Sequence, residues 1–199
     1  MGQDRLASGK KNAARVGAAL VFIDESGFLM MPLVRRTWAP RGQTPLIRHR
    51  TNSYRKVSVI AALVVSPGRD RVQLFFRLHP QANINARLIL AFLKHLGRHF
   101  QCPICLLWDR FMPHRARLVQ NSISHKRGWN SVFLPAYAPE LNPAENVWCY
   151  LKTNPLANEA LYELEDLTQS ARRHGRALQR RQPLLRSLLK HTPLFLRLK

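Results

Sequence analysis

Three acidic residues occupy positions where a carboxylate is costly or directional, and they are the first candidates for chemistry. Asp24 and Asp109 end the apolar runs ALVFID and ICLLWD, and each run is typical of a buried strand. A carboxylate at the end of such a strand is costly unless it is paired or binds a metal ion. Glu145 follows Asn142 and Pro143, a pattern that predicts the first turn of a helix.

A purely structural role is available to each of these acids. Asp24 and Asp109 could each cap the turn that follows its strand. Asn142 and Glu145 have the spacing of a capping box, in which the glutamate stabilises the start of its own helix. Glu25, next to Asp24, would point to the opposite face of a strand, so we leave it outside the predicted site.

Three carboxylates in one place would suit a hard divalent cation such as Mg²⁺, which prefers oxygen ligands. Two such ions can stabilise the attacking and the leaving oxygen of a phosphoryl transfer. The acids therefore predict metal-dependent phosphoryl transfer if the fold brings them together.

The charge of the chain favours a polyanionic partner. Lys and Arg number 32 against 11 Asp and Glu, which gives a formal net charge of +21. Nucleic acid is the leading candidate, because bound phosphates release counterions; an anionic membrane surface and a non-catalytic ribosomal or packaging protein are the alternatives. No apolar run reaches the roughly 18 residues that span a bilayer. The three cysteines form no disulfide framework, fit a reducing cytoplasm, and include a lone Cys102–Cys105 pair better explained by packing than by zinc.

The pattern along the chain predicts a mixed sheet with helices. Strands are expected at residues 18–24, 57–65, 72–78, 104–109 and 131–134, and a turn at Ser26-Gly27 is expected before a further apolar run. A helix capped by Asn83 or Asn85 is expected, and further helices are expected after Asn142 and through the Arg-rich C-terminal region. This order indicates an α/β fold, whose sites gather where strands end.

Three segments in this order resemble the DDE transposases of the Tc/mariner superfamily, in their bacterial insertion-sequence branch. They are FIDESGF at residues 22–28, LLWD at residues 106–109, and LPAYAPELNPAE at residues 134–145. The resemblance implies a ribonuclease-H-like mixed sheet flanked by helices, with Asp24, Asp109 and Glu145 as a catalytic triad. It also implies two Mg²⁺ or Mn²⁺ ions held by that triad, and cleavage and strand transfer of DNA.

The resemblance also sets expectations for domains and partners. We expect a basic arm at residues 1–17, a catalytic domain at 18–155, and basic C-terminal helices at 156–199 that pack on it or extend it. Only 23 residues precede Asp24, too few for the family's helix-turn-helix region. We therefore expect either an upstream segment supplied as a fusion by frameshift, or a truncated chain that is inactive alone. A homodimer, a bacterial cytoplasmic location at the nucleoid, and no membrane contact complete these expectations.

Basic residues near the predicted site are expected to contact DNA. Arg110 stands where the family often has asparagine, and His114 could alternatively orient a triad carboxylate. The predicted DNA-binding residues are Arg48, Arg50, Arg55, Lys56, Arg110, His114 and Lys152. Two other functions stay open: a non-catalytic DNA-binding remnant of a transposase, and another ribonuclease-H-like nuclease.

Overall fold

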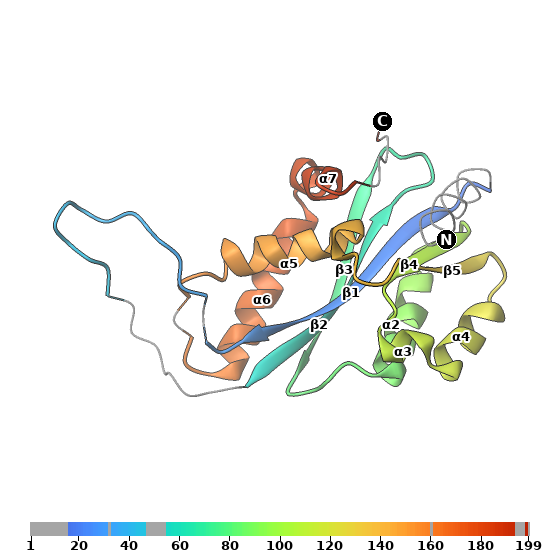
Figure 1. The fold of residues 1–199 in the computed structure, drawn as a ribbon, viewed down its shortest axis with the longest axis horizontal. Helices are drawn as coiled ribbons and strands as arrows, with labels where there is room; N and C mark the ends of the chain where they lie inside the picture. The colour runs from blue at the N-terminus through green and yellow to red at the C-terminus, as the bar shows by residue number, and fades with distance from the viewer. Residues whose placement is uncertain (1–15, 32, 47–54, 160, 194–197, 199) are drawn as a thin grey trace.

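A five-stranded mixed sheet forms the centre of the molecule (Figure 1). The computed structural model describes residues 16–31, 33–46, 55–159, 161–193 and 198. The strands are β1 (Ala19–Leu29), β2 (Lys56–Val65), β3 (Val72–Pro80), β4 (Ile104–Trp108) and β5 (Trp129–Phe133). Their order in the sheet is β3-β2-β1-β4-β5, which confirms the predicted α/β class.

The two halves of the sheet differ in strand direction. β1, β2 and β3 are antiparallel neighbours, whereas β4 and β5 run parallel to β1. β4 pairs with β1 only from Ala19↔Ile104 to Phe22↔Leu107. β1 therefore continues beyond the end of β4, and this stagger leaves the second half of β1 open on one side.

The turn expected at Ser26-Gly27 is wrong, because β1 passes straight through both residues. β2 pairs with β1 along its whole length, including Ser26↔Val59 and Gly27↔Ser58. A glycine breaks a strand only where no partner supplies ladder hydrogen bonds, and here the buried run of β2 supplies them.

Helices cover both faces of the sheet. The helices after β3 are α2 (Ala86–Gly97), α3 (Met112–Arg115) and α4 (Arg117–Ser124), and the later ones are α5 (Pro143–Thr153), α6 (Leu164–Gln179) and α7 (Gln182–Lys190). Of the two candidate caps, it is Asn85 that caps α2, because its side chain accepts a hydrogen bond from the Leu88 N–H at 3.1 Å.

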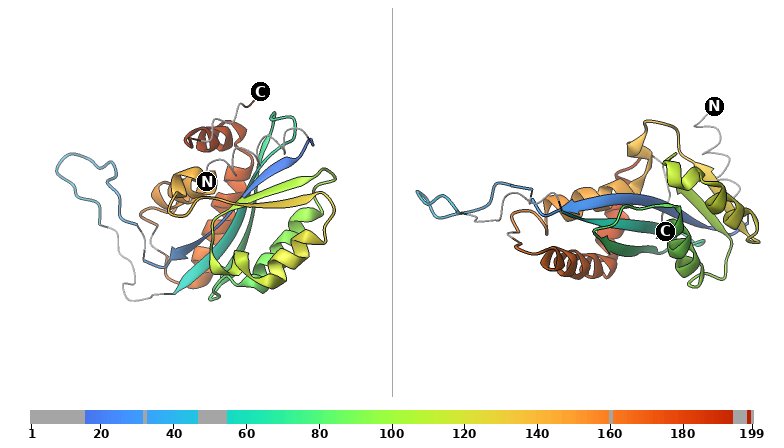
Figure 2. Two further views of the ribbon diagram at one scale, coloured as in Figure 1. Left: turned by 45° about the vertical axis from the view of Figure 1, so that its right-hand side comes forward. Right: turned by 90° about the horizontal axis from the view of Figure 1, so that it is seen from below.

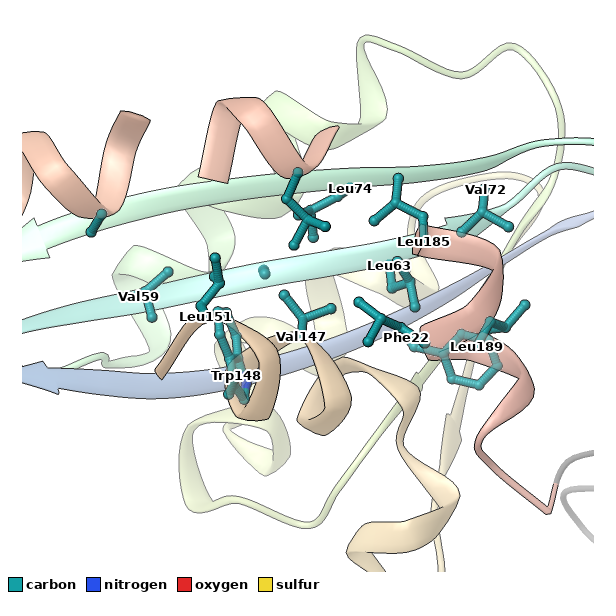
Figure 3. Packing of buried hydrophobic residues seen from close by; sticks show 14 of the residues in the cluster. Phe22, Val59, Leu63, Val72, Leu74, Val147, Trp148, Leu151, Leu185 and Leu189 are labelled. Carbon is teal, nitrogen blue, oxygen red and sulfur yellow. The ribbon is translucent and has the colours of Figure 1, made fainter. Parts of the chain in front are cut away.

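Strand alternation sends successive residues of β1 into two separate cores. Leu20, Phe22 and Phe28 pack with residues of α5, α6 and α7, while Val21 and Ile23 pack with residues of α2 and α4. Figure 3 shows the first of these cores, with Val147, Trp148 and Leu151 of α5 beside the strands. Asp24 lies on this α5 face of β1, and Glu25 lies on the other.

The segment between β1 and β2 leaves the sheet. Residues 33–46 extend away from it without regular secondary structure, as Figures 1 and 2 show from three directions. Several of its apolar side chains are exposed, and Trp38 is the most exposed of them. No helix in the described part of the chain is long and apolar enough to cross a membrane.

Candidate active site

The three acids predicted from the sequence line one cleft of about 430 Å³. Asp24 comes from β1, Asp109 directly follows β4, and Glu145 lies in the first turn of α5. The loop from β5 to α5 also lines the cleft, through residues 134–139. The fold thus brings together side chains that are 121 residues apart at the extremes, Asp24 and Glu145.

The prediction that Asp24 ends its strand is wrong, because β1 continues to Leu29. Its access to the cleft has another cause. β4 stops pairing with β1 at Phe22, two residues before Asp24, so no strand covers this side of Asp24. The stagger of neighbouring strands, rather than the end of a strand, creates the opening.

Asp24 is buried and electrostatically strained. Its side chain is 6% exposed, and its Oδ2 accepts a hydrogen bond from the Trp148 indole N–H at 2.7 Å. Burial, reinforced by the negative charges of Glu145 and Glu25, raises the pKa of Asp24 from 3.8 to about 8. A carboxylate in this position is stabilised by any cation that enters the cleft.

Asp109 is held by a buried histidine. One of its oxygens, Oδ1, accepts a hydrogen bond from the Phe111 backbone N–H at 3.0 Å and lies 2.9 Å from His114 Nδ1. The other ring nitrogen of His114, Nε2, lies 3.0 Å from Glu25 Oε1. Burial alone would raise the pKa of Asp109, but the contacts with His114 and Phe111 outweigh it and lower that pKa.

His114 is completely buried, which corrects the prediction that it contacts DNA. Its ring stacks on Trp108, with ring centroids 4.3 Å apart. Burial alone would lower the pKa of His114, but the hydrogen bonds with Asp109 and Glu25 outweigh it and raise the pKa to about 9. A charged imidazolium therefore bridges two carboxylates, which agrees with the alternative role of orienting a triad carboxylate.

Glu25 belongs to this arrangement although we left it outside the predicted site. It does point to the opposite face from Asp24, as expected for neighbours on a strand. The chain after β4, however, carries His114 round to that face, where His114 contacts Glu25. Single-strand alternation could not reveal this contact, because it depends on where the segment after Asp109 folds.

The capping box suggested for α5 does not form. The Asn142 side chain accepts a hydrogen bond from the Ala144 N–H at 3.3 Å, and its amide donates to the Ile23 carbonyl at 3.1 Å. Asn142 thus ties the start of α5 to β1, next to Asp24. The Glu145 carboxylate makes no hydrogen bond or ion pair with other described residues, so it remains free to bind a ligand in the cleft. Burial raises the pKa of Glu145; the charge of Lys152 opposes this and that of Asp109 adds to it.

The predicted DNA-binding residues are placed at different distances from the cleft. Arg110 is exposed and lines it. The Lys152 Nζ donates a hydrogen bond to Ser26 Oγ at 2.8 Å. Arg55 immediately precedes β2, and its Nη1 lies 3.7 Å from Glu163 Oε2. The exposed Lys56 is the first residue of β2. Arg48 and Arg50 lie outside the described residues.

The three carboxylates do not yet form a closed metal cage. Among the described residues, no group of three or more His, Cys, Asp or Glu side chains is arranged to hold a metal ion. Burial, reinforced by the charges of Glu145 and Glu25, raises the pKa of Asp24, and that electrostatic cost falls when a cation is bound. As donors, three carboxylates lining one cleft fit a hard divalent ion. Binding of such an ion by the triad stays a prediction.

Comparisons with known proteins identify the family and the fold. Residues 19–168 match the family model described as DDE superfamily endonuclease. The chain is similar to the structure of the Mos1 mariner paired-end complex with Mn, with 18% identity and a TM-score of 0.68 over 96% of this chain and 59% of that one. For the catalytic domain of Mos1 mariner transposase, these values are 16% and 0.56 over 87% of this chain and 80% of that one.

The fold is therefore that of the ribonuclease-H-like transposase catalytic domains, as the resemblance implied. The chain spans about 59% of the Mos1 transposase chain in the paired-end complex. A segment of 36 residues is also 44% identical to an uncharacterised protein of Sinorhizobium fredii, y4pE/y4sA. This match covers 18% of this chain and 27% of that protein.

Proposed function

Because this chain belongs to the DDE superfamily endonuclease family, we propose that it is the catalytic domain of a DNA transposase. In this proposal it cleaves a DNA strand and joins the new end to target DNA. The observation that carries the proposal is the convergence of Asp24, Asp109 and Glu145 on one cleft. The net charge of +21 supports DNA as the substrate, since it favours contact with phosphates.

The triad would hold divalent metal ions, Mg²⁺ or Mn²⁺, and we propose two. Structures of the Mos1 transposase catalytic domain carry Mg or Mn, which supports these ions here. When bound, the ions would supply Lewis-acid activation of the scissile phosphate and of the attacking oxygen. The raised pKa of Asp24 supports such a site, because a cation offsets the cost of burying the carboxylate and its repulsion from Glu145 and Glu25.

Other side chains of the protein would position the acids and contact the DNA. His114 holds Asp109 through Nδ1, and the Trp148 N–H holds Asp24, so each carboxylate has one oxygen fixed. Arg110, which lines the cleft, would contact a phosphate of the bound strand. Glu145 would complete the ligand set from the start of α5.

The reaction needs no covalent protein intermediate. In the first step, water attacks the phosphorus, the bond between phosphorus and the 3′ oxygen breaks, and a 3′-hydroxyl and a 5′-phosphate result. In the second step, that 3′-hydroxyl attacks a target phosphodiester, a new P–O bond forms, and a target 3′-hydroxyl leaves. Each attacking oxygen loses one proton and each leaving oxygen gains one.

The wider context of the chain is part of the same proposal. Recognition of the element's ends would come from a helix-turn-helix segment supplied by an upstream frame, and the complex on DNA would contain two copies of this chain. The Mos1 structures with transposon-end DNA support DNA as the partner. The proposed division into a basic arm, a catalytic domain to residue 155 and C-terminal basic helices belongs here too, as does action in a bacterial cytoplasm at the nucleoid.

Nicking of a supercoiled plasmid by the full chain tests the activity. We expect slow, non-specific nicking that requires Mg²⁺ or Mn²⁺. Asp109→Asn should abolish it, because the amide keeps the shape but removes the charge that binds the cation. Glu140→Gln is the matched control. Glu140 is an exposed acid of the segment between β5 and α5, and it does not line the cleft.

The outcomes separate the alternatives. An Asp109→Asn protein that nicks like its parent would contradict the triad. A parent that binds DNA but never nicks it with either metal would instead favour the non-catalytic remnant, and Arg110 beside Asp109 would be the first residue to replace.

A further inference from the structure

One aromatic side chain that lines the cleft does not pack in the hydrophobic core. Tyr137 lies in the loop between β5 and α5, and its relative exposure is 103%. A large ring left entirely in water is unusual unless it serves an interaction. Its position beside the three acids connects that interaction with the cleft.

The backbone at Tyr137 is strained, and the loop that carries this residue is anchored at both ends. Tyr137 has a φ of +56°, a left-handed conformation that side chains other than glycine rarely adopt. The loop is fixed at both ends: the Leu134 N–H donates to the Trp108 carbonyl at 2.7 Å, and Asn142 is bonded to the Ile23 carbonyl. Strain that persists between fixed ends indicates that the surrounding structure imposes this exposed position.

A second ring and a cation stand elsewhere on the rim of the same cleft. Phe111 is 40% exposed and also lines it, next to the exposed Arg110. Phe111 is coupled to the triad, because its N–H donates to Asp109 and its ring contacts His114 edge-on, with centroids 5.6 Å apart. A group stacked on Phe111 is therefore positioned by the same backbone that positions Asp109.

Aromatic rings, a guanidinium and metal-binding acids together match the parts of a nucleotide. Bases stack on aromatic rings, and a guanidinium binds phosphate. A base inside a duplex has both faces covered by its neighbours, so only an unpaired or flipped base can stack on a protein ring. A protein partner fits less well, because the rings stand beside three acids and an arginine rather than within a continuous apolar patch.

We propose that Tyr137 and Phe111 form a stacking site for an unpaired base next to the scissile phosphate, with Arg110 on the adjoining phosphate. DNA would then occupy the cleft with at least one nucleotide unstacked from the duplex. This inference rests on the proposed function for the identity of the substrate. It adds that the cleft selects locally unpaired DNA.

Binding in EDTA tests the site without cleavage. The probes are a short duplex with one 2-aminopurine opposite an abasic site and the same duplex with 2-aminopurine paired to thymine. We expect the full chain to bind the unpaired probe more tightly and to quench its fluorescence by ring stacking. Tyr137→Ala should reduce this preference about tenfold, equivalent to roughly 1.4 kcal/mol. Tyr137→Phe should keep it.

Tyr162→Ala is the matched control, because Tyr162 is an exposed tyrosine that does not line the cleft. Since Tyr137 is fully exposed, its removal should leave the thermal unfolding curve unchanged, which excludes a folding defect. A Tyr137→Ala protein with the parent's preference would overturn the inference. So would a loss of self-association in that variant with the preference intact, since the ring would then serve a second copy.

Failure of the inference and failure of the proposed function are distinguishable. If plasmid nicking is never seen but the preference depends on Tyr137, the stacking site stands and the activity falls. If nicking depends on Asp109 but the preference does not depend on Tyr137, only the stacking site falls.

Discussion

Replacing Asp24 with asparagine should make the protein more stable in the absence of metal, although it removes a proposed metal ligand. The ordinary pKa of an aspartate is 3.8, and burial beside Glu145 and Glu25 raises that of Asp24 to about 8. The folded protein therefore keeps a proton that the unfolded chain releases. The parent must lose stability as the pH rises from about 4 to about 8.

The size of this effect follows from the two pKa values. One pKa unit corresponds to about 1.36 kcal/mol, so a rise from 3.8 to about 8 corresponds to roughly 6 kcal/mol as an upper limit. Relaxation and water penetration reduce such costs, and we expect Asp24→Asn to be roughly 2–4 kcal/mol more stable than the parent at about pH 9. At about pH 4 the two should be nearly equal. The amide oxygen can still accept the Trp148 hydrogen bond.

Urea denaturation in EDTA across this pH range measures the difference. Excess Mg²⁺ should then narrow this difference, because the ion stabilises only the protein that binds it, by about 2.7 kcal/mol at a hundred times the dissociation constant. Glu140→Gln, at an exposed acid, should change stability by less than about 0.5 kcal/mol at every pH. If Asp24→Asn were less stable than its parent at pH 9 in EDTA, the burial argument would be refuted.

Three further changes test other parts of the structure. His114→Gln removes an imidazole whose pKa is raised from 6.5 to about 9 in the folded protein. The parent's advantage in the free energy of unfolding, measured by urea denaturation, should therefore shrink as the pH rises from about 6.5 to about 9. An advantage that is constant with pH would contradict this. Gly175→Ala would place a Cβ 2.5 Å from the Phe76 ring and should cost about 1–3 kcal/mol in thermal unfolding, and an unchanged melting temperature would contradict the packing. Replacing a stripe of three exposed arginines along α6 with neutral residues should make the plot of log DNA affinity against log salt concentration less steep, by up to about 3. An unchanged slope would show that the stripe does not contact phosphates. The residues of that stripe are Arg172 and Arg176 of α6 and Arg180, the C-cap residue of the same helix.

Much of the fold could be predicted from local patterns. The β-branched run at residues 57–65 became β2, and Asn85, one of the two candidate caps, marks the start of α2. These elements are determined by their own residues, because burial on both faces or a side-chain cap leaves a direct trace in the sequence. The same holds for the apolar run that became β4.

The errors share a physical cause. Ser26-Gly27 reads as a turn in isolation, but the ladder with β2 keeps it extended. Asn142 and Glu145 have the spacing of a capping box, but the Asn142 amide is bound to the carbonyl of Ile23, more than a hundred residues earlier. In each case a partner distant in sequence decides the outcome.

The site was only partly accessible to sequence reasoning for the same reason. Asp24, Asp109 and Glu145 could be named, because their motifs are local. The link from Glu25 through His114 to Asp109 could not be derived, since it requires the path of the chain after β4. The exposure of Tyr137 depends on a loop anchored to two strands, and an exposed tyrosine leaves no periodic signal.

Calorimetric titration of the full chain with Mn²⁺ tests the central claim most directly. We expect saturable binding that is lost in Asp109→Asn and Glu145→Gln and retained in Glu140→Gln, with all four proteins folded by circular dichroism. Asp109→Asn and Glu145→Gln proteins that bind Mn²⁺ with the parent's affinity and stoichiometry would show that the cleft acids do not hold the metal, and would contradict the account.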